Sequence, residues 1–419
     1  MTQTKQLAPT ATGPLKGIRI VDLTSVVLGA YATQLLGDLG ADIVKIETPA
    51  PKGGIAGDIL RWGGKSPEGG APGMGPLFMT YNRNKRSVLL DLKKEKARQA
   101  LARMIESADV LASNIRYDGM KRLGLSYEDV RAIKPDIVFV HAAGYGSDGP
   151  YAGLQAYDDL IQAGSGTTEF LSRVDGDPKP RYLPSLIADK TTGLHMVYAI
   201  LAALFHRQRT GEGQFVEVPM LEAFTYFTMS ENLYGHVFEP PTGPYGYSRV
   251  FNPNRRPYQT KDGYLGIVPY SDKQWDDFFA LGGKPRFLAD DPRFNTYQAR
   301  TQHIHELYAL IEEVTVTKTS AEWIELLRAN NIPAMRVNKL EDVMQDEHLA
   351  ATEFFEHYQH PTEGTYVNMR HPVRFTASPA NIRHHPPTLG GATDEVLREY
   401  GYSDEEIAAM RDDGCFGEG

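Results

Sequence analysis

The sequence has 419 residues, of which 41% are hydrophobic, so it can bury a large core and is long enough for two domains. Its formal net charge of -9 disfavours a general nucleic-acid-binding protein, because such proteins usually carry a basic excess. The single cysteine, Cys415, excludes an intrachain disulfide and is typical of a reducing compartment. We find neither a signal-peptide core nor an apolar run of the roughly 20 residues that a membrane span needs. We therefore expect a soluble, cytoplasmic protein that binds neither nucleic acid nor membrane.

The first part of the chain alternates predicted strands and helices. Strands at residues 17–23 and 41–47, joined by a helix at 31–39, form a short βαβ unit. Further strands are expected at 86–92, 108–113 and 137–140, with helices at 94–107 and after the capping box that begins at Ser126. This alternation predicts a largely parallel sheet covered by helices.

Two connections bear on binding. The turn at residues 24–30 lacks the G-x-G-x-x-G pattern that lets a backbone approach a dinucleotide pyrophosphate, so the topology is Rossmann-like but NAD is disfavoured. The Gly- and Pro-rich stretch 52–75 is expected to be a long loop. Such a loop often lies over a site, and a passive surface loop is the alternative.

Asp189 lies where an extended segment, expected to be buried, gives way to a long apolar helix that ends in cations and Gly211. We expect this helix to be buried as well. A carboxylate at its N-terminus would face unsatisfied backbone donors and the positive end of the helix dipole, which favour the ionised form. An ionised carboxylate can act as a nucleophile. Because aspartate is also a common N-cap residue, position alone favours a structural role.

The composition changes near residue 226. Residues 231–258 are dense in Gly, Pro, Tyr and Arg, as expected for a linker or a binding loop. A strand at 263–268 and several helices follow, two of them opened by capping boxes at Thr319 and Ser403. We expect a large Rossmann-like α/β domain made of residues 1–225 and 325–419, and a smaller inserted α+β domain at 226–324.

Common catalytic motifs are missing from the sequence. It has no G-x-S-x-G elbow, no Walker A motif and no H-E-x-x-H or zinc-finger spacing. We therefore expect neither a serine hydrolase nor a P-loop enzyme, and no metal site.

Several short stretches are jointly specific in their order and spacing. They are residues 17–24, 39–47, 82–87, 108–110, 149–151, 157–158, 162–163, 189 and 209–214. Together they resemble the family III CoA-transferases, the group that contains formyl-CoA transferase and carnitine CoA-transferase. The resemblance covers most of the chain.

The resemblance implies a covalent mechanism. In that family the aspartate at the position of Asp189 is the nucleophile, and Tyr157 matches an active-site tyrosine. The implied activity is reversible transfer of CoA between a short-chain or dicarboxylic acyl-CoA, with succinyl-CoA as a candidate, and a carboxylic acid, through aspartyl anhydride and aspartyl-CoA thioester intermediates. CoA would be a substrate, with no permanently bound cofactor. The family forms interlocked homodimers, so the resemblance also implies a dimer.

The resemblance further implies a CoA groove. Lys93 and Arg122 match positions that contact phosphate or nucleotide, and Leu90 and Asn114 match other positions that line the groove. For the two cations, simple surface solvation is the alternative.

Two departures from formyl-CoA transferase concern the acyl group. The glutamine in the first loop of formyl-CoA transferase corresponds to Val27 in this sequence, and that enzyme's run of glycines is replaced by residues 243–247. These differences disfavour formate and oxalate as substrates. Arg255 and Arg256 lie in a Tyr/Pro/Gly-rich loop. We expect their guanidinium groups to bind the distal carboxylate of a dicarboxylic substrate, and a structural ion pair is the alternative.

Three other functions stay open. Acyl-CoA racemases of this family carry a histidine immediately before the aspartate that matches Asp158. Tyr157 replaces that histidine here, which removes a proton carrier suited to neutral pH. An isomerase that transfers CoA within one molecule, and a catalytically silent CoA-binding protein, are the remaining alternatives.

Overall fold

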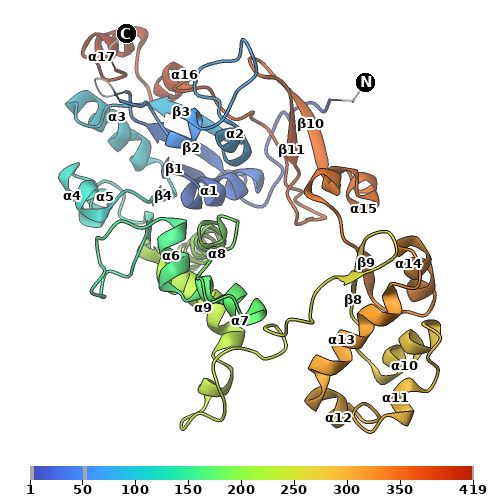
Figure 1. Cartoon of the computed structure of the whole chain (residues 1–419). Helices are drawn as coiled ribbons and strands as arrows, with labels where there is room; N and C mark the ends of the chain where they lie inside the picture. Colours follow the sequence, from blue (N-terminus) through green and yellow to red (C-terminus); the bar gives the residue numbers. More distant parts are fainter. Residues whose placement is uncertain (1–3, 51–53, 418–419) are drawn as a thin grey trace. The chain divides into compact units, whose positions relative to one another are not determined.

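The computed structural model describes residues 4–50 and 54–417 (Figure 1). The chain divides into two compact units. The first contains Met1–Thr167, Tyr182–Phe227 and Ala351–Gly419, and the second contains Thr168–Arg181 and Thr228–Ala350. Residues 325–350, which the sequence analysis assigned to the large domain, thus lie in the second unit. Residues 52 and 53 of the expected long loop lie outside the described residues.

A six-stranded parallel sheet forms the centre of the first unit, in the strand order β3-β2-β1-β4-β5-β6. Figure 1 labels β1 to β4 of this sheet. The strands are β1 (Arg19–Leu23), β2 (Asp42–Glu47), β3 (Lys85–Leu89), β4 (Val110–Ser113), β5 (Val138–Ala143) and β6 (Gln214–Pro219). The predicted Rossmann-like α/β class is therefore confirmed. The order changes direction between β1 and β4, and Rossmann-like sheets bind their ligands at such a switch point.

Both faces of this sheet are buried. On β1, Ile20 belongs to the cluster that packs against α1 (Leu28–Asp38) and α8 (Ile187–Thr210), whereas Val21 belongs to the cluster on the opposite face. The helices that contribute to that second cluster are α3 (Glu95–Glu106), α4 (Tyr117–Arg122), α5 (Tyr127–Ile133), α16 (Thr393–Glu399) and α17 (Asp404–Asp412). Burial on both faces explains why the central strands β4 and β5 are mostly apolar.

The long helix α8 differs from expectation in its exposure. It ends as predicted at Gly211, whose φ of 78° suits a glycine C-cap. The prediction of a fully buried helix is wrong, because Leu194, Tyr198 and Phe205 are 51%, 59% and 59% exposed along one face. The segment before it is not a buried strand either, since Tyr182 is 47% exposed.

The remaining elements of the first unit surround the carboxyl edge of the sheet or form an appended hairpin. The helices are η1 (Ile59–Trp62), α2 (Pro76–Tyr81), α6 (Asp158–Gly164) and the first part of α9 (Met220–Asn232). The antiparallel hairpin consists of β10 (Phe355–His360) and β11 (Gly364–Met369). The capping boxes predicted at Ser126 and Ser403 open α5 and α17.

The second unit has its own core around Trp275, Phe278 and Trp323. A small antiparallel sheet is made of β7 (Tyr258–Gln259), β8 (Tyr264–Ile267) and β9 (Ala334–Arg336). The helices are η2 (Thr167–Glu169), α7 (Phe170–Asp175), η3 (Tyr234–Val237), α10 (Asp272–Leu281), α11 (Phe287–Asp290), α12 (Tyr297–Gln302), α13 (Ile304–Thr315), α14 (Ser320–Ala329), η4 (Leu340–Gln345) and α15 (Glu347–Ala351). The predicted capping box at Thr319 opens α14. Across both units, none of the described helices is long and apolar enough to cross a membrane.

Candidate active site

A cleft of about 680 Å³ opens at the switch point of the large sheet. Ser25 follows β1 and Asn114 follows β4, and both line the cleft together with Gly144 after β5 and Glu217 of β6. Because parallel strands end at the same edge, residues far apart in sequence meet there. All the residues that line this cleft belong to the first unit.

Asp189 lines this cleft from the first turn of α8. It is the third residue of the helix, and the N-cap is Leu186, so the expectation that Asp189 caps the helix is wrong. The backbone N–H of Asp189 donates a hydrogen bond of 3.0 Å to Oδ1 of Asp158. A carboxylate from α6 thus occupies the capping position of α8.

Asp158 is held in place by Gln162, one turn along α6. Nε2 of Gln162 donates to Oδ2 of Asp158 at 2.6 Å, and its Oε1 accepts the backbone N–H of Leu183 at 2.9 Å. Nε2 also lies 3.2 Å from the carbonyl oxygen of Ser185. Asp158 and Gln162 of α6 therefore fix the chain that leads into Asp189.

The Asp189 carboxyl group is less acidic than the sequence predicts. Burial raises its pKa, and the negative charge of Asp158 raises it further, to about 7. The helix dipole was expected to favour ionisation, but burial of the side chain outweighs that effect. At neutral pH the group is therefore divided between its protonated and ionised forms.

Tyr157 lies on the same cleft and is the N-cap residue of α6. Its side chain is 61% exposed, so it is not a core residue. The structure thus brings Tyr157 and Asp189 to one cavity.

A cationic wall is formed by α4 and the residue before it. Arg122 and Asn114, both predicted site residues, line the cleft with Arg116 and Lys121, which the sequence analysis missed. Asn114 fixes the turn after β1, because its Nδ2 donates to the Ser25 carbonyl at 2.8 Å and its Oδ1 accepts the Ser25 N–H at 2.9 Å. Three cations within seven residues, directly after a strand, are the signal that could have revealed this wall.

Leu90 and Lys93 are not among the described residues that line the cleft. Leu90 is fully buried in the core beside α3. Lys93 is exposed in the turn after β3, where its backbone N–H donates to Oδ1 of Asp91 at 3.0 Å. The structure does not bring these two predicted residues together with Asp189.

Arg255 and Arg256 are exposed and lie in the second unit. Arg256 forms an ion pair with Glu312 of α13, the arrangement that the sequence analysis gave as the alternative to substrate binding. The backbone N–H of Arg255 donates to the Asn252 carbonyl at 3.0 Å.

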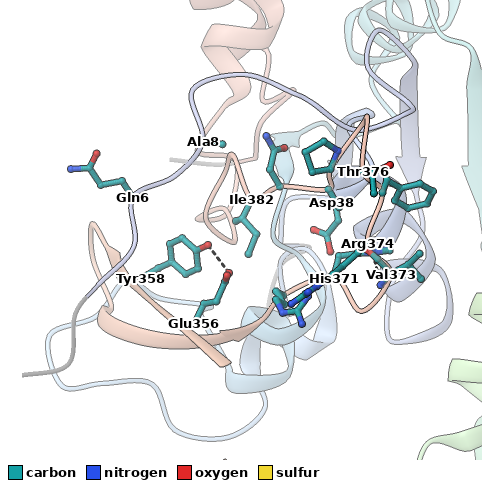
Figure 2. Close-up of a pocket in the computed structure, with 15 residues that line it drawn as sticks. Gln6, Ala8, Asp38, Glu356, Tyr358, His371, Val373, Arg374, Thr376 and Ile382 are labelled. Atoms are coloured by element: carbon teal, nitrogen blue, oxygen red, sulfur yellow. Dashed lines mark hydrogen bonds between the residues drawn. The ribbon is translucent and has the colours of Figure 1, made fainter. Parts of the chain in front are cut away.

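A second cavity, of about 540 Å³, lies between the N-terminal segment, β10 and the segment after β11 (Figure 2). The Tyr358 hydroxyl donates to Glu356 at 2.8 Å on its wall (Figure 2). Within the described part of the chain, this cavity shares no lining residue with the Asp189 cleft. The described residues also contain no group of three His, Cys, Asp or Glu side chains that could hold a metal ion.

The Rossmann-like sheet, the cations at its switch point and the adjacent buried carboxylate define an α/β protein suited to an anionic ligand. Comparison with known proteins specifies the class further. The profile of CoA-transferase family III matches residues 15–393, and the chain belongs to this family. It is therefore a CoA-transferase, and CoA thioesters are the substrates of such enzymes.

Relatives match almost the whole chain. A formyl-CoA:oxalate CoA-transferase from Escherichia coli O6:H1 is 29% identical over 95% of this chain and 98% of its own length. Among solved structures, Rv3272 from Mycobacterium tuberculosis is 29% identical, with a TM-score of 0.78, over 92% of this chain and 99% of the other. A CaiB/BaiF family protein from Brucella suis is 30% identical, with a TM-score of 0.74, over 93% and 100%.

Proposed function

We propose that this enzyme transfers CoA reversibly between a short-chain or dicarboxylic acyl-CoA and a carboxylic acid, with Asp189 as the covalent nucleophile. The observation that carries the proposal is the position of Asp189, whose partly buried carboxyl group lines a cleft with a cationic wall and has a pKa of about 7. A free carboxylate at a helix end would serve mainly as a cap, whereas this one faces the cavity.

Burial of Asp189 favours covalent catalysis. The environment that raises its pKa disfavours the anion relative to any uncharged form of the group. An acyl anhydride and a thioester are both uncharged at the aspartyl carbon. The site is therefore expected to stabilise acylated Asp189 relative to its free carboxylate.

The first half-reaction has two steps. The Asp189 carboxylate attacks the thioester carbonyl, the C–S bond breaks, and CoA leaves as a thiolate while an acyl anhydride forms on Asp189. The thiolate then attacks the aspartyl carbonyl and expels the first carboxylate, which leaves an aspartyl-CoA thioester. No proton needs to be transferred in either step.

The second half-reaction is the reverse with a new acid. The acceptor carboxylate attacks the aspartyl-CoA thioester and releases the thiolate, which attacks the acceptor carbonyl of the new anhydride to give the product acyl-CoA and free Asp189. Because the acyl group never passes to water, the energy of the thioester is conserved. The cleft must therefore keep both CoA and the acyl group away from solvent.

Charge complementarity supports CoA binding along α4. CoA carries several phosphate charges, which guanidinium and ammonium groups bind well. We assign the phosphates to Arg116, Lys121 and Arg122, and the pantetheine arm to the neighbourhood of Asn114. Tyr157 is proposed to contact the acyl group next to Asp189. The roles that the resemblance gives to Leu90 and Lys93 stay predictions.

Succinyl-CoA is our candidate donor. The Escherichia coli relative carries a name that specifies formate and oxalate. The first-loop glutamine that the resemblance assigns to formyl-CoA transferase corresponds here to Val27, which is 1% exposed and has no side-chain amide. Arg255 is the proposed contact for the distal carboxylate of a dicarboxylic substrate, because its neighbour Arg256 is paired with Glu312.

A homodimer is part of the proposal. Leu194, Tyr198 and Phe205 form an exposed apolar stripe on α8, and such a stripe is typical of a protein interface. We propose that a second copy covers it, in the interlocked arrangement that the resemblance implies, and that the dimer works in the cytoplasm.

An acyl-CoA epimerase is the second candidate. A carboxyl group with a pKa of about 7 also suits proton transfer at neutral pH. An epimerase would exchange the α-proton of an acyl-CoA with solvent, whereas a transferase needs no such exchange.

The decisive assay uses isotopes. The enzyme is incubated in D₂O with succinyl-CoA and ¹³C-labelled carboxylic acids, and the CoA thioesters are analysed by mass spectrometry. We expect ¹³C in the thioester pool without deuterium at the α-carbon, and no transfer in an Asp189→Ala variant. Deuterium without ¹³C transfer would favour the epimerase, and CoA binding without either would favour a silent binding protein.

A further inference from the structure

The turn after β1 contains a residue in an unfavourable backbone conformation. Val26 has a φ of 64°, in the left-handed region that β-branched residues strongly avoid. The same residue lines the cleft beside Ser25 and Leu28. A strained residue persists only where its surroundings determine its conformation, and such residues cluster at functional sites.

Asp58 supplies the principal restraint on Val26. The Val26 N–H lies 3.2 Å from Oδ1 and 3.1 Å from Oδ2 of Asp58, so the carboxylate accepts it with both oxygens. Asp58 is 2% exposed and also accepts the Leu60 N–H at 3.0 Å. The loop that follows β2 therefore places a buried carboxyl group against the turn that lines the cleft.

Lys45 on β2 holds both Asp58 and the turn. Its Nζ lies 3.3 Å from Oδ2 of Asp58 and donates to the Thr24 carbonyl at 2.7 Å. Burial alone would lower the pKa of Lys45, but the carboxylates of Asp22 and Asp58 outweigh it and the pKa is raised. Lys45 is therefore a fixed cation that holds the side chain of Asp58 and the backbone of Thr24 in place.

The residue before Val26 is restrained from the other side of the switch point. Asn114 binds both the N–H and the carbonyl of Ser25. The backbone from Thr24 to Val26 is thus fixed by side chains from β2, from the loop after β2 and from the residue that follows β4. This degree of restraint exceeds what a surface turn requires.

We infer that Asp58 is a positioning residue of the active site, which holds Val26 in the left-handed conformation and thereby fixes the cleft wall against bound CoA thioester. This role rests on the proposed function, because it places CoA in the Asp189 cleft. Asp58 acts through Val26 and does not line the cleft itself among the described residues.

Two structural roles could also explain the burial of Asp58. It is the N-cap of η1, and it is an ionic partner of Lys45. Neither role depends on the side chain at position 26, so under either of them the effects of changing Asp58 and Val26 would be independent. Under the inferred role they are coupled, since glycine adopts a positive φ without strain.

A double-mutant cycle tests the coupling. The Kd for CoA is measured by titration calorimetry for wild type, D58A, V26G, V26A and the two double variants, each shown to be folded by its thermal unfolding. We expect D58A to weaken CoA binding by about tenfold, because the turn loses its restraint. V26G alone should change the Kd by less than about threefold, and D58A/V26G should bind within about threefold of V26G. V26A controls for loss of side-chain volume without relieving the strain, so D58A/V26A should bind as weakly as D58A.

The results distinguish failure of the positioning role from failure of the proposed function. A D58A effect of equal size in the V26G, V26A and wild-type backgrounds, or no D58A effect at all, would overturn the positioning role. If D58A does not fold, D58N replaces it in the same cycle, because it keeps the size of the side chain and removes its charge. A wild-type protein that binds no CoA would instead overturn the proposed function, a result that the wild-type titration alone reveals.

Discussion

The backbone N–H of Asp189 donates a 3.0 Å hydrogen bond to Oδ1 of Asp158, so the carboxylate of one helix satisfies a donor at the start of another. The bond brings two acidic residues together beside the cleft. Burial of the Asp189 side chain and, to a smaller extent, the charge of Asp158 both make a negative charge at Asp189 unfavourable. The acidity of Asp189 therefore depends on its burial and, to a smaller extent, on a residue 31 positions earlier in the chain.

Replacing Asp158 should change the pH dependence of the reaction. In Asp158→Asn, removal of the neighbouring charge lowers the pKa of Asp189 below about 7, although burial, the larger cause, keeps it above 3.8. If catalysis needs ionised Asp189, the acidic limb of kcat/KM moves to lower pH. The pH profile measures this, with the exposed neighbour Asp159→Asn as the control. An unmoved limb would show that Asp158 does not act on Asp189 through its charge.

The ionisation of Asp189 should also affect stability. Its folded-state pKa of about 7 exceeds its ordinary value of 3.8, so the folded protein binds more protons between these values and loses stability as the pH rises through about 7. Asp189→Asn cannot ionise. We expect it to be more stable than wild type by roughly 1–3 kcal/mol at pH 8 and nearly equal to it at pH 4. Denaturant titrations at both pH values test this, and a stability difference that does not depend on pH would contradict it.

Arg122 and Lys93 should differ in their effect on acyl-CoA binding. Arg122 lines the cleft, whereas Lys93 is exposed outside it. We expect Arg122→Ala to raise the KM for acyl-CoA by about tenfold with little change in kcat, consistent with loss of one charge-assisted contact. The effect should shrink as salt is added. If Lys93 is only solvated, Lys93→Ala should stay within about twofold of wild type. A larger effect would show that CoA extends beyond the cleft to Lys93, the role that the resemblance implies.

Arg255 and Arg256 should differ from each other. Arg256 is paired with Glu312 on the surface, so Arg256→Ala is expected to cost less than about 1 kcal/mol of stability and to leave acceptor KM values unchanged. Arg255→Ala should raise the KM for succinate and not that for butyrate, because only succinate has a distal carboxylate. If Arg255→Ala leaves the KM for succinate and the KM for butyrate at their wild-type values, the proposed contact is excluded.

Local features of the fold could be predicted from the sequence because their causes lie within a few residues. The capping boxes at Ser126, Thr319 and Ser403 depend on side chains three positions apart, and all three are present. The βαβ alternation likewise predicted the parallel sheet. The chain position of Asp189, at the start of a long helix, followed from the same kind of pattern.

Features set by distant residues could not be predicted in this way. The pKa of Asp189 depends on burial and on Asp158, which the sequence analysis could not place beside it. The left-handed Val26 was unexpected because valine disfavours that conformation, and the restraint comes from Asp58, 32 residues away. The exposed stripe on α8 was missed because an apolar run does not reveal which of its faces the chain itself covers.

Trapping of the acyl-enzyme tests the central claim most directly. The protein is incubated briefly with succinyl-CoA, quenched with hydroxylamine and digested, and the peptides that contain position 189 are analysed by mass, with Asp189→Ala as the control. Because hydroxylamine converts an aspartyl anhydride or thioester into a hydroxamate, we expect a hydroxamate at Asp189 and none in the control. Its absence across a panel of acyl-CoAs, in a protein that binds CoA, would contradict covalent catalysis by Asp189.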